Sequence, residues 1–334
     1  NLERSKTCIT PKVYDNLRRA ISQHKTEALQ RAEAEVDFCE KKGIRIITLN
    51  DEDYPYRLKE IPDPPLALFS KGAANFNAKR VIAVVGTRKI SEYGKDICRI
   101  FLSNLKSLSS DTLILSGLAY GVDICAHRAC LENDLPTVGI LAHGLDRIYP
   151  SLHSDTAIRM LEQGALLTEY MSETNPDKGN FVRRNRIVAG MADATIVVES
   201  ADKGGALITA NLALDFNREV FAFPGRINDE YSQGCNKLIA EQKAALITSA
   251  NDFVKAMNWN TSQQNFTQPT LFPLLNEEEE LIWKALEGHI EGKTANILCV
   301  QLNIPIHRII SHLSVMVTNG WVKQLCGGRY KLLS

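Results

Sequence analysis

The sequence predicts an α/β fold organised around a doubly wound parallel sheet, and two regular features lead to that prediction. Short apolar runs rich in β-branched residues recur between positions 81 and 225, and such runs are typical of strands buried inside a parallel sheet. Segments of helical length separate them, which indicates a parallel sheet with helices on both faces. The predicted strands are residues 81–86, 112–117, 137–141, 165–170, 195–200 and 219–225. The predicted helices are residues 92–108, 123–132, 156–162, 181–191 and 206–217.

The amino-terminal part of the chain is predicted to be helical. Residues 11–42 repeat apolar side chains at about the 3.6-residue period of a helix, and Gly43 ends the pattern. We therefore assign residues 1–50 to an N-terminal helical segment. The stretch 44–72 holds two short apolar runs separated by turns rich in Asp and Pro, and we interpret it as an approach to the main domain.

The main domain is placed at residues 51–257, and a second domain follows it. Residues 258–275 carry no charged side chain and are rich in Asn, Gln, Thr and Pro, which predicts a linker. The pattern of residues 276–334 is typical of three helices followed by a two-stranded wing that turns at Gly327 and Gly328. The sequence therefore predicts a C-terminal winged-helix domain.

Composition excludes several classes of protein. A chain of 334 residues with 44% hydrophobic and 23% charged residues is neither fibrous nor disordered, and it is long enough for two or three domains. Lys and Arg together number 39, as do Asp and Glu, so any site for a polyanion must be local. The eight cysteines form no CxxC pair and no zinc-site spacing, which favours a reduced, cytoplasmic protein without a metal or cofactor. No apolar run reaches the roughly 18 to 20 residues of a membrane helix, so no membrane contact is expected.

Ligands of open parallel sheets bind outside the carboxyl ends of the strands, so the loops there are the candidates for a site. In the first loop, Gly86, Thr87 and Arg88 offer backbone amides and a guanidinium to an anion, although an exposed basic turn is the alternative. Neither a GxGxxG nor a GxxxxGK[ST] motif is present, which argues against dinucleotide and P-loop triphosphate sites.

The second and third loops contain groups that are better explained as structural. Gly117 permits a close backbone approach, and Asp123 and His127 fall on one face of the helix that follows. No nucleophile stands beside them, so we interpret them as a pair that braces the loop rather than as an acid and base. His143, Asp146 and Arg147 in the third loop are expected to line a site without catalysing a reaction.

The strongest local signal lies at residues 178–186. This segment holds four cations and no acid, with Phe181 among them. Cations can bind phosphates and an aromatic ring can stack on an unpaired base, so the pattern indicates single-stranded nucleic acid. The alternative is that the ring belongs to the core and that the arginines are solvated or ion-paired. The cations are Lys178, Arg183, Arg184 and Arg186.

A second possible anion site lies in the fifth loop. Lys203, Gly204 and Gly205 precede a predicted helix, so backbone amides and the helix dipole can attract a phosphate there. Two phosphate-sized sites at neighbouring strand ends could follow a nucleic-acid backbone, or they could hold one mononucleotide.

Several motifs in this order resemble the family of the DNA-processing protein DprA, also called Smf, over about residues 55–253. The resemblance implies an extended Rossmann-like domain that binds single-stranded DNA, protects incoming DNA and loads the RecA recombinase in natural transformation and recombination, without catalytic turnover. It also implies a homodimer formed through this domain, near residues 238–239. The motifs are VGTR at 85–88, SGLAYGVDICAH at 116–127, GLDRIYP at 144–150, TEY at 168–170, FVRRNRIVAG at 181–190, GGALITA at 204–210 and FAFPG at 221–225.

The resemblance also assigns roles to residues. It implies that Arg88 and Lys178 hold phosphates and that Phe181 lies against a base, while Arg183, Arg184, Asn185, Lys203 and Gly204 complete the rim. Residues 1–50 resemble the later part of a SAM-like or helix-hairpin-helix domain. The predicted DNA-binding set is Gly86, Thr87, Arg88, Gly117, Lys178, Gly179, Asn180, Phe181, Arg183, Arg184, Asn185, Lys203, Gly204 and Gly205.

Two other functions fit parts of the pattern. The Gly-Gly loop resembles that of nucleoside-monophosphate phosphoribohydrolases of the lysine-decarboxylase-like family, which carry a PGGxGT motif and a catalytic Glu. Here Lys203 replaces the proline, and residues 211–215 contain no Glu, so a general acid or base is lacking. A transcription regulator would use the winged helix, but residues 276–334 have six cations and six acids, which disfavours strong duplex binding and favours a protein contact or weak DNA binding.

Overall fold

The computed structural model describes residues 11–259, 275–289, 292–325 and 327–332. The chain divides between residues 261 and 262 into two compact units, which are described separately. Most of the predicted linker lies outside the described residues.

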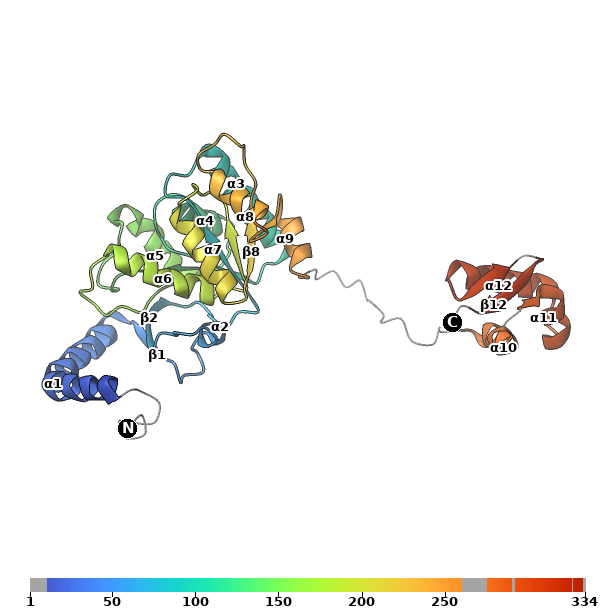
Figure 1. Cartoon of the computed structure of the whole chain (residues 1–334), viewed down its shortest axis with the longest axis horizontal. Coiled ribbons are helices and arrows are strands. Elements are labelled where there is room, and N and C mark those ends of the chain that lie inside the picture. Colours follow the sequence, from blue (N-terminus) through green and yellow to red (C-terminus); the bar gives the residue numbers. More distant parts are fainter. Residues whose placement is uncertain (1–10, 260–274, 290–291, 326, 333–334) are drawn as a thin grey trace. The chain divides into compact units, whose positions relative to one another are not determined.

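The larger unit is built on a nine-stranded sheet of order β1-β2-β6-β5-β4-β3-β7-β8-β9 (Figure 1). The strands from β6 to β9 in this order are parallel to their neighbours, which confirms the predicted α/β fold with a large parallel sheet. The parallel strands are β3 (Arg80–Val85), β4 (Thr112–Ser116), β5 (Thr137–Ile140), β6 (Ala165–Thr168), β7 (Ala194–Val197), β8 (Glu219–Ala222) and β9 (Ala245–Leu246).

The segment interpreted as an approach to the main domain belongs to the sheet itself, so that interpretation was wrong. Its two apolar runs are β1 (Arg45–Thr48) and β2 (Ala67–Gly72), which pair with each other in antiparallel fashion. β2 also pairs antiparallel with β6. The pairing joins segments about a hundred residues apart, and the turns between the two short runs, including α2 (Tyr56–Lys59), hide the pattern in the sequence.

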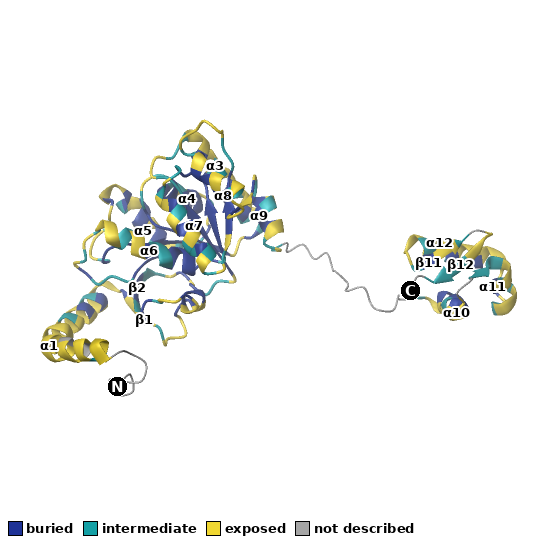
Figure 2. Cartoon of the chain, in the orientation of Figure 1, coloured by how far each residue is buried: buried dark blue, intermediate teal, exposed yellow. Residues whose placement is uncertain are grey.

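Helices cover both faces of the sheet because successive side chains of each central strand point to opposite faces. In β3, Val81, Ala83 and Val85 join one hydrophobic core, and Ile82 and Val84 join another. All five are buried, and Figure 2 shows the strands buried beneath helices with exposed outer faces. The helices are α3 (Glu92–Leu108), α4 (Val122–Glu132), α5 (Ser154–Gln163), α6 (Lys178–Gly190), α7 (Gly205–Asp215), α8 (Gln233–Ala240) and α9 (Ala250–Ala256). A short 3₁₀ helix, Ser151–His153, precedes α5.

The N-terminal helix α1 (Pro11–Lys42) has the predicted length and stop, because Gly43 follows it with a φ of 62°. The carboxyl-terminal part of α1 is fixed to the loop after β6. Glu35 is buried and accepts hydrogen bonds from the backbone amide of Ser172 (2.9 Å) and from its hydroxyl (2.6 Å). Arg31 donates to the Ser172 carbonyl at 2.6 Å and pairs with Glu35 at 2.9 Å.

The described residues of the smaller unit form three helices and a three-stranded antiparallel sheet of order β10-β12-β11. Asn276 and Glu279 form a reciprocal capping box at the start of its first helix. β11 and β12 correspond to the predicted two-stranded wing, and the sequence analysis did not identify β10. The elements are α10 (Glu277–Leu286), β10 (Lys293–Thr294), α11 (Ala295–Leu302), α12 (Ile306–Thr318), β11 (Val322–Leu325) and β12 (Arg329–Leu332).

The ion pair between the buried Arg57 and the part-buried Asp193 gives a test of the fold. Arg57 is 2% exposed, donates to both carboxylate oxygens of Asp193 at 2.6 and 2.8 Å, and bonds the Ala78 carbonyl at 3.0 Å. We expect Arg57→Met to destabilise the protein by about 3 kcal/mol, because it leaves the carboxylate without its partner. Guanidinium chloride unfolding measures the change. The control Arg99→Met breaks an exposed pair with Asp96 and should cost under about 0.5 kcal/mol, and equal losses in the two variants would contradict the expectation.

Candidate nucleic-acid interface

A cavity of about 570 Å³ opens at the carboxyl ends of β3, β4 and β7. Its walls come from the loops after these strands, the loop after β5, and the first turns of α6 and α7. In a parallel sheet these strand ends lie at one edge, so residues distant in the sequence meet there. The predicted site residues that line the cavity are Gly86, Thr87, Arg88, Gly117, Lys178, Phe181, Arg184, Asn185, Gly204 and Gly205.

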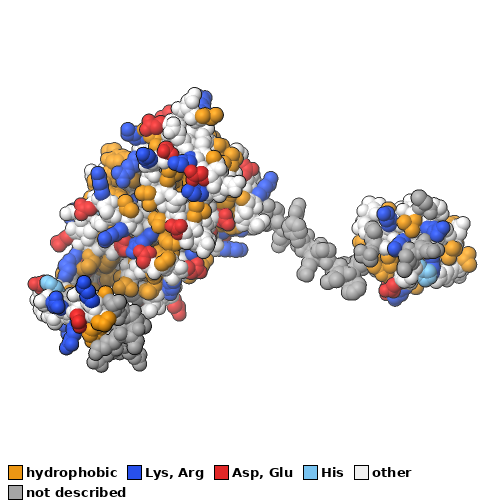
Figure 3. Space-filling view, in the orientation of Figure 1, with side chains coloured by type: hydrophobic (Ala, Val, Ile, Leu, Met, Phe, Trp, Pro, Cys, Tyr) orange, Lys and Arg blue, Asp and Glu red, His pale blue; other side chains and the backbone are white. Residues whose placement is uncertain are grey.

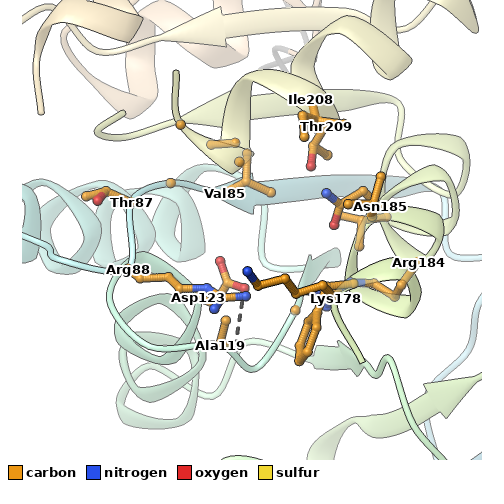
Figure 4. Close-up of a pocket in the computed structure, with 18 of the residues that line it drawn as sticks. Val85, Thr87, Arg88, Ala119, Asp123, Lys178, Arg184, Asn185, Ile208 and Thr209 are labelled. Atoms are coloured by element: carbon orange, nitrogen blue, oxygen red, sulfur yellow. Dashed lines mark hydrogen bonds between the residues drawn. The ribbon is translucent and has the colours of Figure 1, made fainter. Parts of the chain in front are cut away.

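Two cations enter the cavity from opposite sides. Arg88 follows β3, Lys178 lies in the first turn of α6, and both side chains extend into the same space in Figure 4. Both residues are exposed to solvent. Elsewhere, basic and acidic side chains are interspersed over the face shown in Figure 3, so the positive charge of this site is local.

Phe181 belongs to the cavity wall and not to a hydrophobic core. Its ring is only half-buried. The guanidinium carbon of Arg88 lies 5.1 Å from the ring centroid, within the range of a cation–π contact. The ring of Tyr149 is 6.1 Å away, centroid to centroid, with the two planes tilted by 56°. The alternative that this aromatic side chain is part of the core is therefore wrong.

Arg184 lies beneath the cavity and not on its rim, which corrects its predicted position. Its side chain is buried, and Nη1 donates a hydrogen bond to the Ile140 carbonyl at the end of β5. A Cβ on Gly117 would lie 2.1 Å from that nitrogen, so the guanidinium fits only because residue 117 has no side chain. Burial lowers the pKa of Arg184, and the nearby carboxylate of Asp123 partly offsets this effect. These groups form the floor of the cavity.

The remaining predicted residues lie outside the lining of this cavity. Arg183 and Lys203 are exposed. Asn180, next to Gly179, donates to the Asn175 carbonyl at 3.0 Å and so joins the start of α6 to the preceding loop. Arg186, counted as a fourth cation of the segment, forms ion pairs with Glu169 at 2.6 Å and Asp63 at 2.8 Å. For Arg186 the ion-pair alternative is therefore correct.

The expected pair of Asp123 and His127 is not formed. Asp123 is in the first turn of α4 and accepts a hydrogen bond from the Ala119 amide at 3.3 Å, so it does brace the loop (Figure 4). His127 lies one turn later, where its Nδ1 is 2.7 Å from the hydroxyl of Thr137 on β5. Burial raises the pKa of Asp123, and Arg184 opposes that rise.

The third loop braces the site, and its predicted polar residues do not line the cavity. His143 is buried, with Nδ1 2.8 Å from the Gly144 carbonyl oxygen. Asp146 and Arg147 bond the segment that precedes α6. The loop residue that lines the cavity is Tyr149, which the sequence analysis missed although it stands in the GLDRIYP motif. Val182 and Ile208 were missed as well, because only the folded chain places them beside the cations.

Comparisons with known proteins identify the family. A family model described as DNA recombination-mediator protein A matches residues 45–258. The chain belongs to this family. This family member is 39% identical over 230 residues to the DNA processing protein DprA of Bacillus subtilis, covering 69% of this chain and 76% of the relative. It is 32% identical over 307 residues to protein Smf of Escherichia coli, covering 90% of this chain and 80% of the relative.

Solved structures of related proteins share the fold of this family member. The X-ray structure of DprA from Streptococcus pneumoniae matches with a TM-score of 0.60 and 37% identity, covering 64% of this chain and 74% of that one. The DprA structure from Helicobacter pylori matches with a TM-score of 0.58 and 28% identity, covering 64% of this chain and 96% of that one. That structure is described as giving insight into the single-stranded DNA binding mode of the Helicobacter protein.

In the ranges that the structure describes, no three His, Cys, Asp or Glu side chains are grouped so as to hold a metal ion. No described helix is both long enough and apolar enough to cross a membrane.

The buried imidazole of His127 predicts a loss of stability in mild acid. Burial, aided by His153 and Arg184, lowers its pKa to about 3. Below pH ~6.5 the unfolded chain takes up a proton at this residue that the folded protein does not, so stability falls as the pH falls. Between pH 7 and pH 5 the free energy of unfolding of the wild type should fall by about 2 kcal/mol more than that of His127→Gln, as measured by urea unfolding. Equal losses in both proteins would show that the imidazole titrates normally in the fold.

Proposed function

We propose that this protein binds single-stranded DNA in the cavity at the carboxyl ends of β3, β4 and β7. The observation that carries the proposal is the approach of Arg88 and Lys178 from opposite sides of the cavity, with the half-buried ring of Phe181 beside Arg88. Cations bind phosphates irrespective of sequence, and an aromatic face stacks on an unpaired base. The likeness to the Helicobacter protein supports the same ligand.

Single strands fit this arrangement better than duplex DNA. A duplex keeps its bases stacked and paired, so their faces are not available to Phe181. The first turns of α6 and α7 also line the cavity, and the positive ends of helices attract phosphates. Arg183 and Lys203, exposed outside the lining, would extend the positive charge beyond the cavity, and Gly179 and Asn180 would shape the turn that presents Lys178.

The wider role that we propose is protection of incoming DNA and loading of RecA recombinase onto it during natural transformation and recombination, in the cytoplasm. Membership of the DNA recombination-mediator family supports this role.

We further propose that the larger unit forms a homodimer. Leu238 is buried in its own core, so of the predicted pair only Ile239 is partly available to a second copy. The smaller unit is proposed to be a winged-helix domain that contacts protein or weakly binds DNA.

The phosphoribohydrolase alternative is not favoured by the site. Asp123 is the one carboxylate among the residues that line the cavity, and its oxygen already accepts the Ala119 amide. In α7, where such an enzyme needs a catalytic Glu, the acid nearest the expected position is Asp215, at the carboxyl end of the helix and outside the cavity lining. A catalytic acid or base must reach the atom that it protonates or deprotonates.

Binding to labelled oligo-dT and to a duplex of equal length at two salt concentrations tests the proposal. By fluorescence anisotropy, Arg88→Ala and Lys178→Ala should each weaken single-strand binding by about 1.5 to 3 kcal/mol, since each removes a charged hydrogen bond to phosphate. Lys89→Ala is the control, because that exposed cation is outside the lining of the cavity. Equal or tighter binding of the duplex by the wild type would overturn the proposal, and release of free base from AMP would favour the enzyme.

The ring of Phe181 gives a second prediction, which differs from the first in how the affinity for DNA depends on salt concentration. Phe181→Ala should weaken binding of oligo-dT by about 1 to 3 kcal/mol and leave the salt dependence almost unchanged, because stacking releases no counterions. The slope of log Kd against log salt, measured for both proteins, separates this effect from a lost cation. A lower melting temperature with normal binding would instead make the ring a structural residue.

A further inference from the structure

Tyr149 is an exposed aromatic residue at the mouth of the cavity. It lies in the loop between β5 and α5, outside the set of residues predicted to bind DNA. Its residue surface is 46% exposed although it lines the cavity and lies beside Phe181. Val182 and Ile208, also exposed, line the same cavity. Large apolar side chains gathered at a surface cavity indicate a binding surface, here one that suits the apolar faces of bases.

Hydrogen bonds connect the loop that carries Tyr149 to the start of α6, which carries Phe181. Asp146 accepts the Glu173 amide at 3.0 Å, and Arg147 donates to the side chain of Asn175 at 2.8 Å. The Asn175 carbonyl in turn accepts the side-chain amide of Asn180, the residue before Phe181. The loop of Tyr149 and the start of α6 are therefore held together before any ligand arrives, which lowers the entropy lost on binding.

The two rings form an open wedge and not a parallel clamp. A base that stacks on two rings at once requires both rings to lie parallel to it, and therefore to each other. Here the centroids are 6.1 Å apart and the planes are tilted by 56°, so one base cannot stack on both rings at once. A base that stacks on Phe181 presents its edge to the ring of Tyr149, in the edge-to-face arrangement that aromatic systems favour.

We propose that Tyr149 is a second base-contacting residue, and that it forms with Phe181 an aromatic wedge for one unpaired base of the bound strand. The inference rests on the proposed single-stranded DNA binding. It extends the proposed binding surface from the phosphate-binding cations Arg88 and Lys178 to the loop that follows β5, since all of these line one cavity.

Tyr149→Ala and a matched control, Tyr120→Ala, test the wedge in the full chain. Tyr120 is 45% exposed, packs against His153 at 5.0 Å between ring centroids, and lies outside the lining of the cavity. The probes are labelled oligo-dT and an abasic deoxyribose-phosphate oligomer of the same length. Tyr149→Ala should weaken binding of oligo-dT roughly 5-fold to 150-fold and leave binding of the abasic oligomer unchanged. Tyr120→Ala should change neither.

A double variant tests whether the two rings share one base. The fold-loss of affinity for oligo-dT in the double variant Tyr149→Ala with Phe181→Ala should be smaller than the product of the two single fold-losses. Either substitution alone already removes one of the two rings that hold the base. Tyr149→Phe keeps the ring and should bind oligo-dT within about two-fold of the wild type, in line with edge-to-face packing. If the two single fold-losses of affinity simply multiply in the double variant, the proposal that both rings contact one base is overturned.

The remaining outcomes separate this inference from the proposed function. If the wild type binds oligo-dT and Arg88→Ala weakens that binding while Tyr149→Ala does not, the wedge is overturned and the DNA-binding function stands. An equal loss on the abasic oligomer would show that Tyr149 acts through the backbone or the loop, which also overturns the base contact. If the wild type fails to bind oligo-dT, the proposed function itself fails.

Discussion

The buried guanidinium of Arg184 is the contact on which the geometry of the cavity depends. A charged group taken out of water is costly unless hydrogen bonds and opposite charge compensate it. The Ile140 carbonyl and the neighbouring Asp123 supply that compensation, and Gly117 leaves the space for the side chain. The contact joins α6 to the carboxyl ends of β4 and β5. Since Phe181 lies one turn before Arg184 on the same helix, its position at the cavity follows from the same contact.

Around this fixed floor, polar contacts hold the loops to one another, in addition to the apolar packing of Leu145, Ile148 and Met171 against neighbouring core clusters. Asp146 and Arg147 join the loop after β5 to the segment before α6. The same segment is bonded at Ser172 to the buried Glu35 of α1. Binding residues on surface loops are held in place by such supporting contacts to the rigid scaffold. The N-terminal helix thereby contributes to the order of the site although none of its residues lines the cavity.

The sequence predicted the parts of this architecture that depend on local pattern. Each β-branched run from residue 81 to 222 became a strand, and Lys178 and the ring of Phe181 fell at the cavity. The strands β1 and β2 escaped prediction because β2 pairs antiparallel with the distant β6, and β1 joins the sheet only through β2. Arg184 and Arg186 are the same type of residue in the same segment, so the sequence does not distinguish their roles. Their contact partners in the folded chain do. Arg184 reaches Ile140 in the floor, and Arg186 reaches the part-buried Glu169 and the exposed Asp63.

The first turn of α6 shows why Lys178 is better explained by a ligand than by the stability of the helix. That turn contains no acid, and its N-cap residue Asp177 makes no side-chain capping hydrogen bond. A lysine at the positive end of a helix dipole costs about 0.3 to 1 kcal/mol relative to an anion there. α7 begins in the same way, at Gly204 and Gly205, without an acid or a side-chain cap. Both helices direct the positive ends of their dipoles at one cavity, with the Asp177 carboxylate as the one acid at either cap, and a phosphate arriving between them would be attracted by both ends.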